Sequence, residues 1–198
     1  MKQLIIKIVL AIVIVVLVYL VVQSVSKPVK FNKEKERREN VVINRLKDIR
    51  SAQLLFKNYY DGYAPTWDTM ISFLETAEIP IVKIMPDPED TTFTKTINDT
   101  IGYINAADSL FKGNIAVEEI KYIPFSDGEI FEINAGKIEK GSVKVNVFEV
   151  SCLYEQFLKG LEEQLIVNLV ATRKQLDKFP GLKVGSMEEP STDGNWEY

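Results

Sequence analysis

The stretch that decides the fold is residues 45–75, RLKDIRSAQLLFKNYYDGYAPTWDTMISFLE. In and just before its first half, apolar residues recur every three or four positions, which is the spacing of one face of an α-helix. That apolar face consists of Val42, Leu46, Ile49, Ala52 and Phe56. The spacing predicts an amphipathic spine helix over about residues 33–60, and we expect this face to be the interaction face of the helix.

The spine helix is expected to end at an aromatic corner, NYYDGYAPTW at residues 58–67. Gly62 is expected to take the left-handed backbone conformation that closes many helices, and Thr66 to cap a second helix over about residues 67–77. The aromatic residues of the corner are Tyr59, Tyr60, Tyr63 and Trp67. We interpret them as a packed hinge where the two helices meet a sheet, because aromatic rings bury a large apolar area. The alternative interpretation is a carbohydrate-binding platform.

The second half of the chain changes to the alternating pattern of antiparallel strands. The helical part is expected to end at Pro80, Pro86 and Pro88. The expected strand features are a hairpin of 120–125 with 130–133, a turn at Ala135-Gly136, a strand over 143–152 and a short strand within 179–185. Residues 153–159 favour a helix, whereas residues 165–171 fit either a helix or a strand. The predicted fold class is therefore α+β, with the spine helix packed on a small antiparallel β-sheet.

An apolar segment precedes the spine helix. Residues 4–22 form an almost unbroken run of Leu, Ile and Val in which Lys7 is the only charge. As a helix this run is roughly 28 Å long, close to the thickness of a bilayer's hydrocarbon core. We predict a transmembrane anchor over residues 1–26 and a soluble domain over residues 27–198, with Pro28 interrupting the helix between them. A signal peptide cleaved near residues 24–26 is the alternative.

The composition argues against several classes of function. The chain has 198 residues, a formal net charge of −4, one cysteine and no histidine. A net negative charge argues against a nucleic-acid partner, because such binding needs a basic face. Without histidine, the chain cannot form the Ser–His or Cys–His pairs of common nucleophilic enzymes. We therefore expect a protein that is not an enzyme, uses no cofactor and binds no nucleic acid.

Carboxylates are the remaining groups that suit catalysis or metal binding. The pairs considered for acid–base chemistry are Asp87 with Asp90 and Glu188 with Glu189, and the candidates for a Ca²⁺ site are Asp193 and Glu197. The pairs lie in proline-rich or tail segments typical of solvated loops, and the Ca²⁺ candidates match no ordered loop motif. Cys152 follows an alternating strand and is expected to be buried. The sequence therefore predicts neither an active site nor a metal centre.

The order of elements and the pattern in residues 37–75 resemble type IV pilins, and especially the pseudopilins of type II secretion. The residues that carry the resemblance are Arg45, Ile49, Ala52, Tyr59, Gly62, Tyr63, Pro65 and Leu74. The resemblance implies a helical spine whose upper half packs on a small antiparallel sheet, an extracytoplasmic location and a role in a secretion or filament apparatus. Residues 1–10, MKQLIIKIVL, lack the glycine of the prepilin cleavage motif.

Residues 27–38 help to predict on which side of the membrane the domain lies, because they are rich in Lys and Arg and directly follow the apolar segment. The positive-inside rule favours a cytoplasmic domain, whereas the pilin resemblance implies a periplasmic one. We follow the resemblance. The expected function is that of a non-enzymatic, membrane-anchored envelope protein, a structural or assembly component that associates with itself or with envelope partners. The alternative is a membrane-tethered periplasmic binding module for a protein or glycan.

Overall fold

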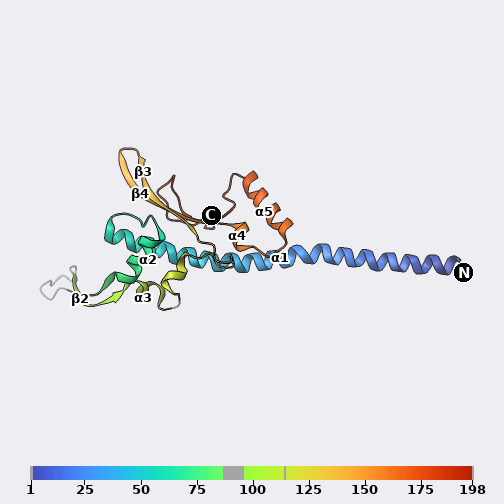
Figure 1. The fold of residues 1–198 in the computed structure, drawn as a ribbon, viewed down its shortest axis with the longest axis horizontal. Coiled ribbons are helices and arrows are strands. Elements are labelled where there is room, and N and C mark those ends of the chain that lie inside the picture. Colours follow the sequence, from blue (N-terminus) through green and yellow to red (C-terminus); the bar gives the residue numbers. More distant parts are fainter. Residues whose placement is uncertain (1, 87–95, 114, 198) are drawn as a thin grey trace.

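A computed structural model describes residues 2–86, 96–113 and 115–197 and shows an α+β chain built along one long helix (Figure 1). This helix, α1, runs from Lys2 to Tyr60. Its second half carries all the other elements, while its N-terminal part projects from them. The expected interruption at Pro28 is wrong, since α1 continues through this residue. Proline removes one backbone donor, and the remaining hydrogen bonds of so long a helix hold the turn together.

The corner after α1 is closed by Asp61. Asp61 adopts the left-handed conformation with φ 50°, and its backbone N–H donates to the carbonyl of Lys57. The prediction that Gly62 takes this conformation is therefore wrong, and aspartate is among the few residues that tolerate it. The second helix, α2 (Trp67–Thr76), is confirmed, and the Thr66 side chain accepts a hydrogen bond from the Thr69 N–H as its N-cap.

The first strand was not predicted from the sequence. Strands β1 (Glu78–Pro86) and β2 (Thr96–Asn105) pair antiparallel as a two-stranded sheet. Pro80 and Pro86, expected to mark the end of the helical part, lie within or at the end of β1. A two-stranded sheet tolerates proline because each strand leaves one side unpaired.

A second sheet has three antiparallel strands in the order β3-β4-β5. They are β3 (Glu132–Lys140), β4 (Val143–Leu153) and β5 (Gly181–Gly185), of which β4 and β5 confirm the expected strands. Two expectations are wrong here. Ala135-Gly136 lies inside β3, and the turn comes after Lys140. The hairpin expected at 120–133 is reduced to one bridge between Tyr122 and Ile130, because residues before the bridge form the 3₁₀ helix η1 (Val117–Lys121).

Three short helices complete the fold: α3 (Ala106–Phe111), α4 (Tyr154–Phe157) and α5 (Glu163–Gln175). α4 falls within the helix expected at residues 153–159, and α5 settles residues 165–171 as helical. In Figure 1, α4, α5 and the three-stranded sheet lie on one side of α1, and the β1–β2 sheet with α3 lies on the other. The spine helix therefore forms the centre of the domain.

The middle of α1 is covered by β5, whose two terminal glycines have little space around them. A Cβ atom on Gly181 would lie 2.0 Å from the carbonyl oxygen of Cys152, and one on Gly185 would lie 2.2 Å from that of Phe148. Gly185 also has a positive φ of 75°. A side chain at either position would push β5 away from β4, so both glycines are required for the sheet that covers the helix.

Candidate functional site

The apolar face expected to be the interaction face of the spine helix is buried inside the domain. Its five side chains have exposed fractions of 0% to 7%: Val42, Leu46, Ile49, Ala52 and Phe56. They belong to the core that α1 forms with α2, η1 and the three-stranded sheet. The domain itself therefore covers this face, and the surface that the spine helix offers to solvent lies on its other side.

The uncovered face of the spine helix is mostly polar. We call it the polar stripe, and its exposed side chains are Lys33, Arg37, Asn40, Asn44, Lys47, Ser51, Leu54 and Asn58. They recur at intervals of four and three residues, so they form one continuous line along the helix. The stripe is therefore accessible to solvent along the length of the spine helix.

The aromatic corner is half core and half surface. Tyr63 and Trp67 are buried, and the Trp67 indole N–H donates to the Phe131 carbonyl at 2.8 Å. Tyr59 and Tyr60 are exposed, although both rings form T-shaped contacts with the Phe73 ring. Two rings of the corner therefore belong to the core, and the other two lie on its surface.

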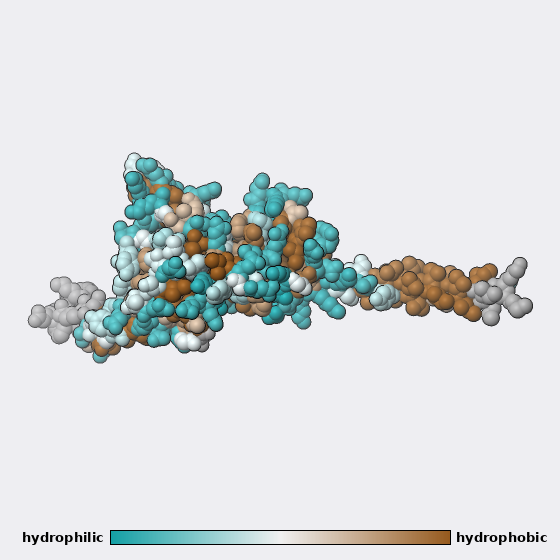
Figure 2. Space-filling model, viewed as in Figure 1, coloured by the Kyte–Doolittle hydropathy of each residue, from teal (hydrophilic) through white to brown (hydrophobic). Residues whose placement is uncertain are grey.

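The N-terminal part of α1 exposes its apolar side chains on every side. From Ile6 to Val22 the large apolar residues are 46% to 68% exposed, and Figure 2 shows them as an apolar rod outside the domain. This stretch is long and apolar enough to cross a membrane. A rod of this length without protein contacts has far more exposed apolar surface than a domain surface normally carries.

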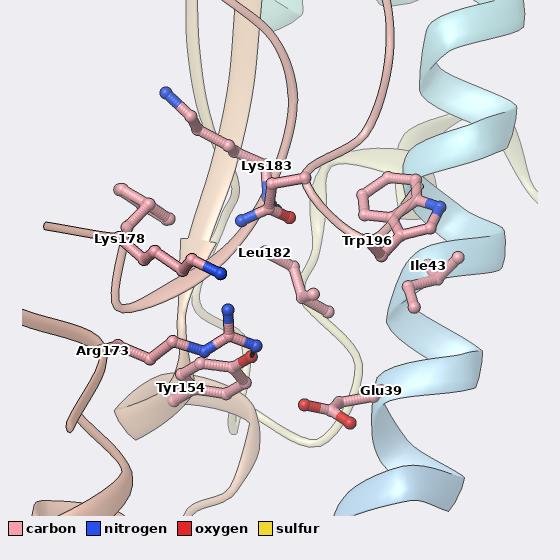
Figure 3. Close-up of a pocket in the computed structure, with 10 residues that line it drawn as sticks. Glu39, Ile43, Tyr154, Arg173, Lys178, Leu182, Lys183 and Trp196 are labelled. Atoms are coloured by element: carbon pink, nitrogen blue, oxygen red, sulfur yellow. Dashed lines mark hydrogen bonds between the residues drawn. The ribbon is translucent and has the colours of Figure 1, made fainter. Parts of the chain in front are cut away.

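A cavity of about 510 Å³ lies where five parts of the chain meet beside α1 (Figure 3). Its lining comes from α1, the start of α4, the end of α5 with the loop that follows, β5 and the C-terminal loop. The lining residues are Glu39, Ile43, Tyr154, Arg173, Lys178, Phe179, Leu182, Lys183, Asn195 and Trp196. The cavity is thus mixed in character, with charged groups and an apolar wall.

The charged groups of the cavity are mainly cationic. Arg173 and Lys178 direct their charged ends towards the same region of the cavity (Figure 3). Lys183 is turned away and forms an ion pair with Glu149 at 2.8 Å. The one carboxylate in the lining, Glu39, is paired with Lys35 at 3.3 Å.

Tyr154 lies between these charges. Its hydroxyl accepts a hydrogen bond from the Arg173 guanidinium at 3.1 Å. Burial of the ring, followed by the negative charge of Glu39, raises the pKa of Tyr154 to about 12. The Tyr154 hydroxyl is therefore neutral at physiological pH. Loss of hydration on burial is the main cause of its raised pKa.

The other chemical candidates from the sequence have partners of their own, are exposed or lie outside the described residues. Glu197 forms an ion pair with Arg50 at 3.0 Å, and the Asp193 carboxylate accepts a hydrogen bond from Ser191. Glu188 and Glu189 are exposed, and Asp87 with Asp90 lies outside the described residues. Within residues 2–86, 96–113 and 115–197, no three acidic, Cys or His side chains cluster in a way that suits a metal ion.

Cys152 is buried in β4 as expected, and burial raises the pKa of its thiol to about 12. A thiol that stays protonated in the core is a poor nucleophile. Its place in the sheet is therefore structural.

The cavity was not predicted from the sequence. No recognisable motif marks the segments that contain Tyr154, Arg173 and Lys178. The part of the cavity wall that belongs to α1 lies more than a hundred residues earlier in the chain. The one available signal was the aromatic C-terminal loop around Trp196. No protein-family model, no curated protein and no solved structure matches the chain.

Proposed function

We propose that this protein is a non-enzymatic, single-pass membrane protein of the cell envelope that acts as a pilin-like structural or assembly component. One observation carries the proposal: the exposed apolar rod and the buried spine of the α+β domain are a single unbroken helix. Such a helix holds the domain in a defined orientation on the bilayer, as a subunit of an ordered assembly requires. The pilin-like pattern in residues 37–75 supports the same role.

The proposal places residues 4–22 in the bacterial inner membrane and the domain in the periplasm, as the pilin resemblance implies. Just after this segment, Lys27 lies 3.5 Å from Glu162 at the start of α5. Lys27 lies five positions beyond Val22 on the helix, a rise of roughly 7.5 Å. The start of α5 therefore lies close to the level of the lipid headgroups.

Association in this proposal uses two surfaces. Within the bilayer, neighbouring helices pack through the apolar rod, where van der Waals contact rather than the hydrophobic effect drives association. Outside the bilayer, the polar stripe meets a neighbour through hydrogen bonds and charges, which favour a defined register over high affinity.

Membrane insertion is tested by flotation of the full chain with liposomes. The wild type should float, whereas a variant with both Leu10→Arg and Val16→Arg should stay in the dense fraction, since arginine is costly near the middle of a bilayer. The matched control adds the same two charges on the polar stripe, as Asn40→Arg with Ser51→Arg, and should float. Flotation of the rod variant would refute the anchor.

Assembly and orientation are tested in cells. A single cysteine introduced at Asn44, on the polar stripe, should form crosslinks between copies, whereas one at exposed Glu139 on β3 should not. A protein tagged after the last residue should lose the tag when spheroplasts are treated with protease. A protected tag, or crosslinks to other proteins alone, would refute the pilin-like role.

The second candidate function is a membrane-tethered binding module. The cavity favours it, because the C-terminal loop provides Asn195 and Trp196 to its wall. The same crosslinking experiment separates the two candidates, since a binding module predicts partners at the C-terminal loop rather than copies at the polar stripe.

A further inference from the structure

We infer that the cavity beside α1 binds a small organic anion that carries a flat apolar group. The inference deepens the binding-module candidate by naming its ligand class, and it does not depend on insertion into a membrane. It follows from the placement of Arg173 and Lys178 opposite an apolar wall in a cavity of about 510 Å³.

The first argument is an imbalance of charge. Three cationic side chains line the cavity, against the single carboxylate of Glu39. That carboxylate is already paired with Lys35, and Lys183 is already paired with Glu149. Among the described residues, neither Arg173 nor Lys178 forms an ion pair, yet both reach the same space (Figure 3). An anion between them would relieve their repulsion and make charge-assisted hydrogen bonds.

The second argument is that the cationic end of the cavity is held in place. Arg173 donates to the Tyr154 hydroxyl at 3.1 Å, and its guanidinium lies 5.7 Å from the centre of the Tyr154 ring. Tyr154 itself is 1% exposed, so it fixes the arginine from a rigid position in the core. A planar guanidinium that is oriented in this way is suited to carboxylate or phosphate oxygens.

The third argument concerns the apolar wall and the size. Leu182 is buried, and Ile43, Phe179 and Trp196 are half-buried around the same space. Asn195 fixes the C-terminal loop to β5, because it accepts from the Lys183 N–H and donates to the Gly181 carbonyl. A volume of this size falls within the range of roughly 300–1,000 Å³ that is usual for small-molecule sites. Because Phe179 and Trp196 belong to this wall, it suits a flat aromatic group.

The test uses the two tryptophans as separate reporters. The full chain, labelled with ¹⁵N and held in neutral-detergent micelles, is titrated with phenylacetate, phenyl phosphate and uncharged 2-phenylethanol. The Trp196 indole signal, assigned with a Trp196→Phe variant, reports on the cavity wall. The Trp67 indole donates to Phe131 in the core and serves as the internal control.

The expected result is a saturable shift of the Trp196 signal with at least one of the two anions, no saturable shift with 2-phenylethanol and an unmoved Trp67 signal. The anion that binds more tightly, phenylacetate or phenyl phosphate, shows whether the cavity prefers a carboxylate or a phosphate. Lys178→Gln and Arg173→Gln should each weaken binding by roughly tenfold or more, the loss typical of one charge-assisted hydrogen bond.

The matched control is Lys174→Gln, which removes the same charge from exposed Lys174 on α5, next to Arg173 but outside the cavity lining. It should bind as the wild type does. The inference is overturned if neither anion saturates, if 2-phenylethanol binds equally well, or if Lys174→Gln costs as much as Lys178→Gln. An unchanged Trp67 signal shows that each variant is folded, and flotation or crosslinking results do not affect this outcome.

Discussion

Gln53 on the spine helix makes two buried hydrogen bonds to the backbone of Ala64, one in each direction. The side-chain amide donates to the Ala64 carbonyl at 3.0 Å, and the side-chain oxygen accepts from the Ala64 N–H at 2.8 Å. Both residues are 0% exposed. A single side chain therefore completes the backbone of the connection between α1 and α2, as a neighbouring strand would in a sheet.

Replacing Gln53 by Met should destabilise the domain strongly. Methionine has a similar length but leaves both backbone groups of Ala64 buried without partners, which costs about 3 kcal/mol. Chemical unfolding of the full chain in micelles, followed by near-ultraviolet circular dichroism, measures this loss. The same change at exposed Gln175, at the end of α5, should leave the transition within about 0.5 kcal/mol. Equal stability of the two variants would show that the Ala64 groups are satisfied in another way.

Leu46→Asp should unfold the domain. Leu46 is 0% exposed in the core, and an unpaired carboxylate there is expected to cost about 4 kcal/mol or more. The control is Asn44→Asp, two residues away on the polar stripe, where the change should be nearly neutral. The two variants can be compared by resistance to limited proteolysis. A protected domain in Leu46→Asp would contradict the assigned core face.

Arg38 should hold the end of α4 against the spine helix. Its guanidinium donates to the carbonyls of Phe157 and Lys159 at 3.0 and 2.9 Å, while Glu34 accepts from it at 3.0 Å. Arg38→Gln should therefore increase hydrogen exchange of the Leu158 and Leu161 amides by about tenfold or more.

Arg37→Gln is the matched control for Arg38. Arg37 contacts the same Glu34 carboxylate at 2.6 Å, but it is on the exposed side of the helix and makes no hydrogen bond to α4 among the described contacts. Exchange at the end of α4 should stay at the wild-type rate. If both variants speed exchange equally, the shared ion pair and not the link to α4 controls this region.

The Cys152 thiol should be unreactive in the folded protein. Burial raises its pKa from 9.0 to about 12, so at pH 8 the thiolate fraction is about a thousandfold lower than for an ordinary thiol. Because the unfolded thiol ionises first, the stability from keeping it neutral is complete below pH 9.0 and is lost as the pH rises towards 12.

Alkylation by iodoacetamide, followed by mass spectrometry, tests the state of this thiol. At pH 8 the folded chain should stay unmodified, and the denatured chain should react fully. Rapid labelling of the folded chain would show that β4 opens to solvent, since Cys152 is 2% exposed.

The local parts of the fold were predictable because short-range patterns determine them. The spacing of Leu46, Ile49 and Phe56 requires a helix with one buried face, and Thr66 caps α2 through its own side chain. Strand β1 does not follow from the sequence around Pro80, because the cost of a proline in a strand depends on whether a neighbouring strand needs an N–H at that position. That dependence lies in the pairing of strands and not in the local sequence.

The aromatic corner also has a feature that the local sequence does not determine. Tyr60 and Tyr63 are alike in sequence, yet Tyr63 packs on the Phe148 ring and is buried while Tyr60 is exposed. The difference depends on where β4 lies. Likewise, Arg173 and Lys178 have no distinguishing pattern in the sequence, and they line one cavity only because the fold places the end of α5 and the following loop near β5 and the C-terminal loop.

By itself the sequence determined an apolar segment of membrane-spanning length, an amphipathic helix after it and an α+β class, because hydrophobic periodicity and composition act over a few neighbouring residues. The tertiary structure alone decided that the two segments form one helix, that the apolar face faces inward and that a cationic cavity forms beside it. These features arise from contacts between residues far apart in the chain, such as Glu39, Tyr154 and Trp196, which local patterns do not encode.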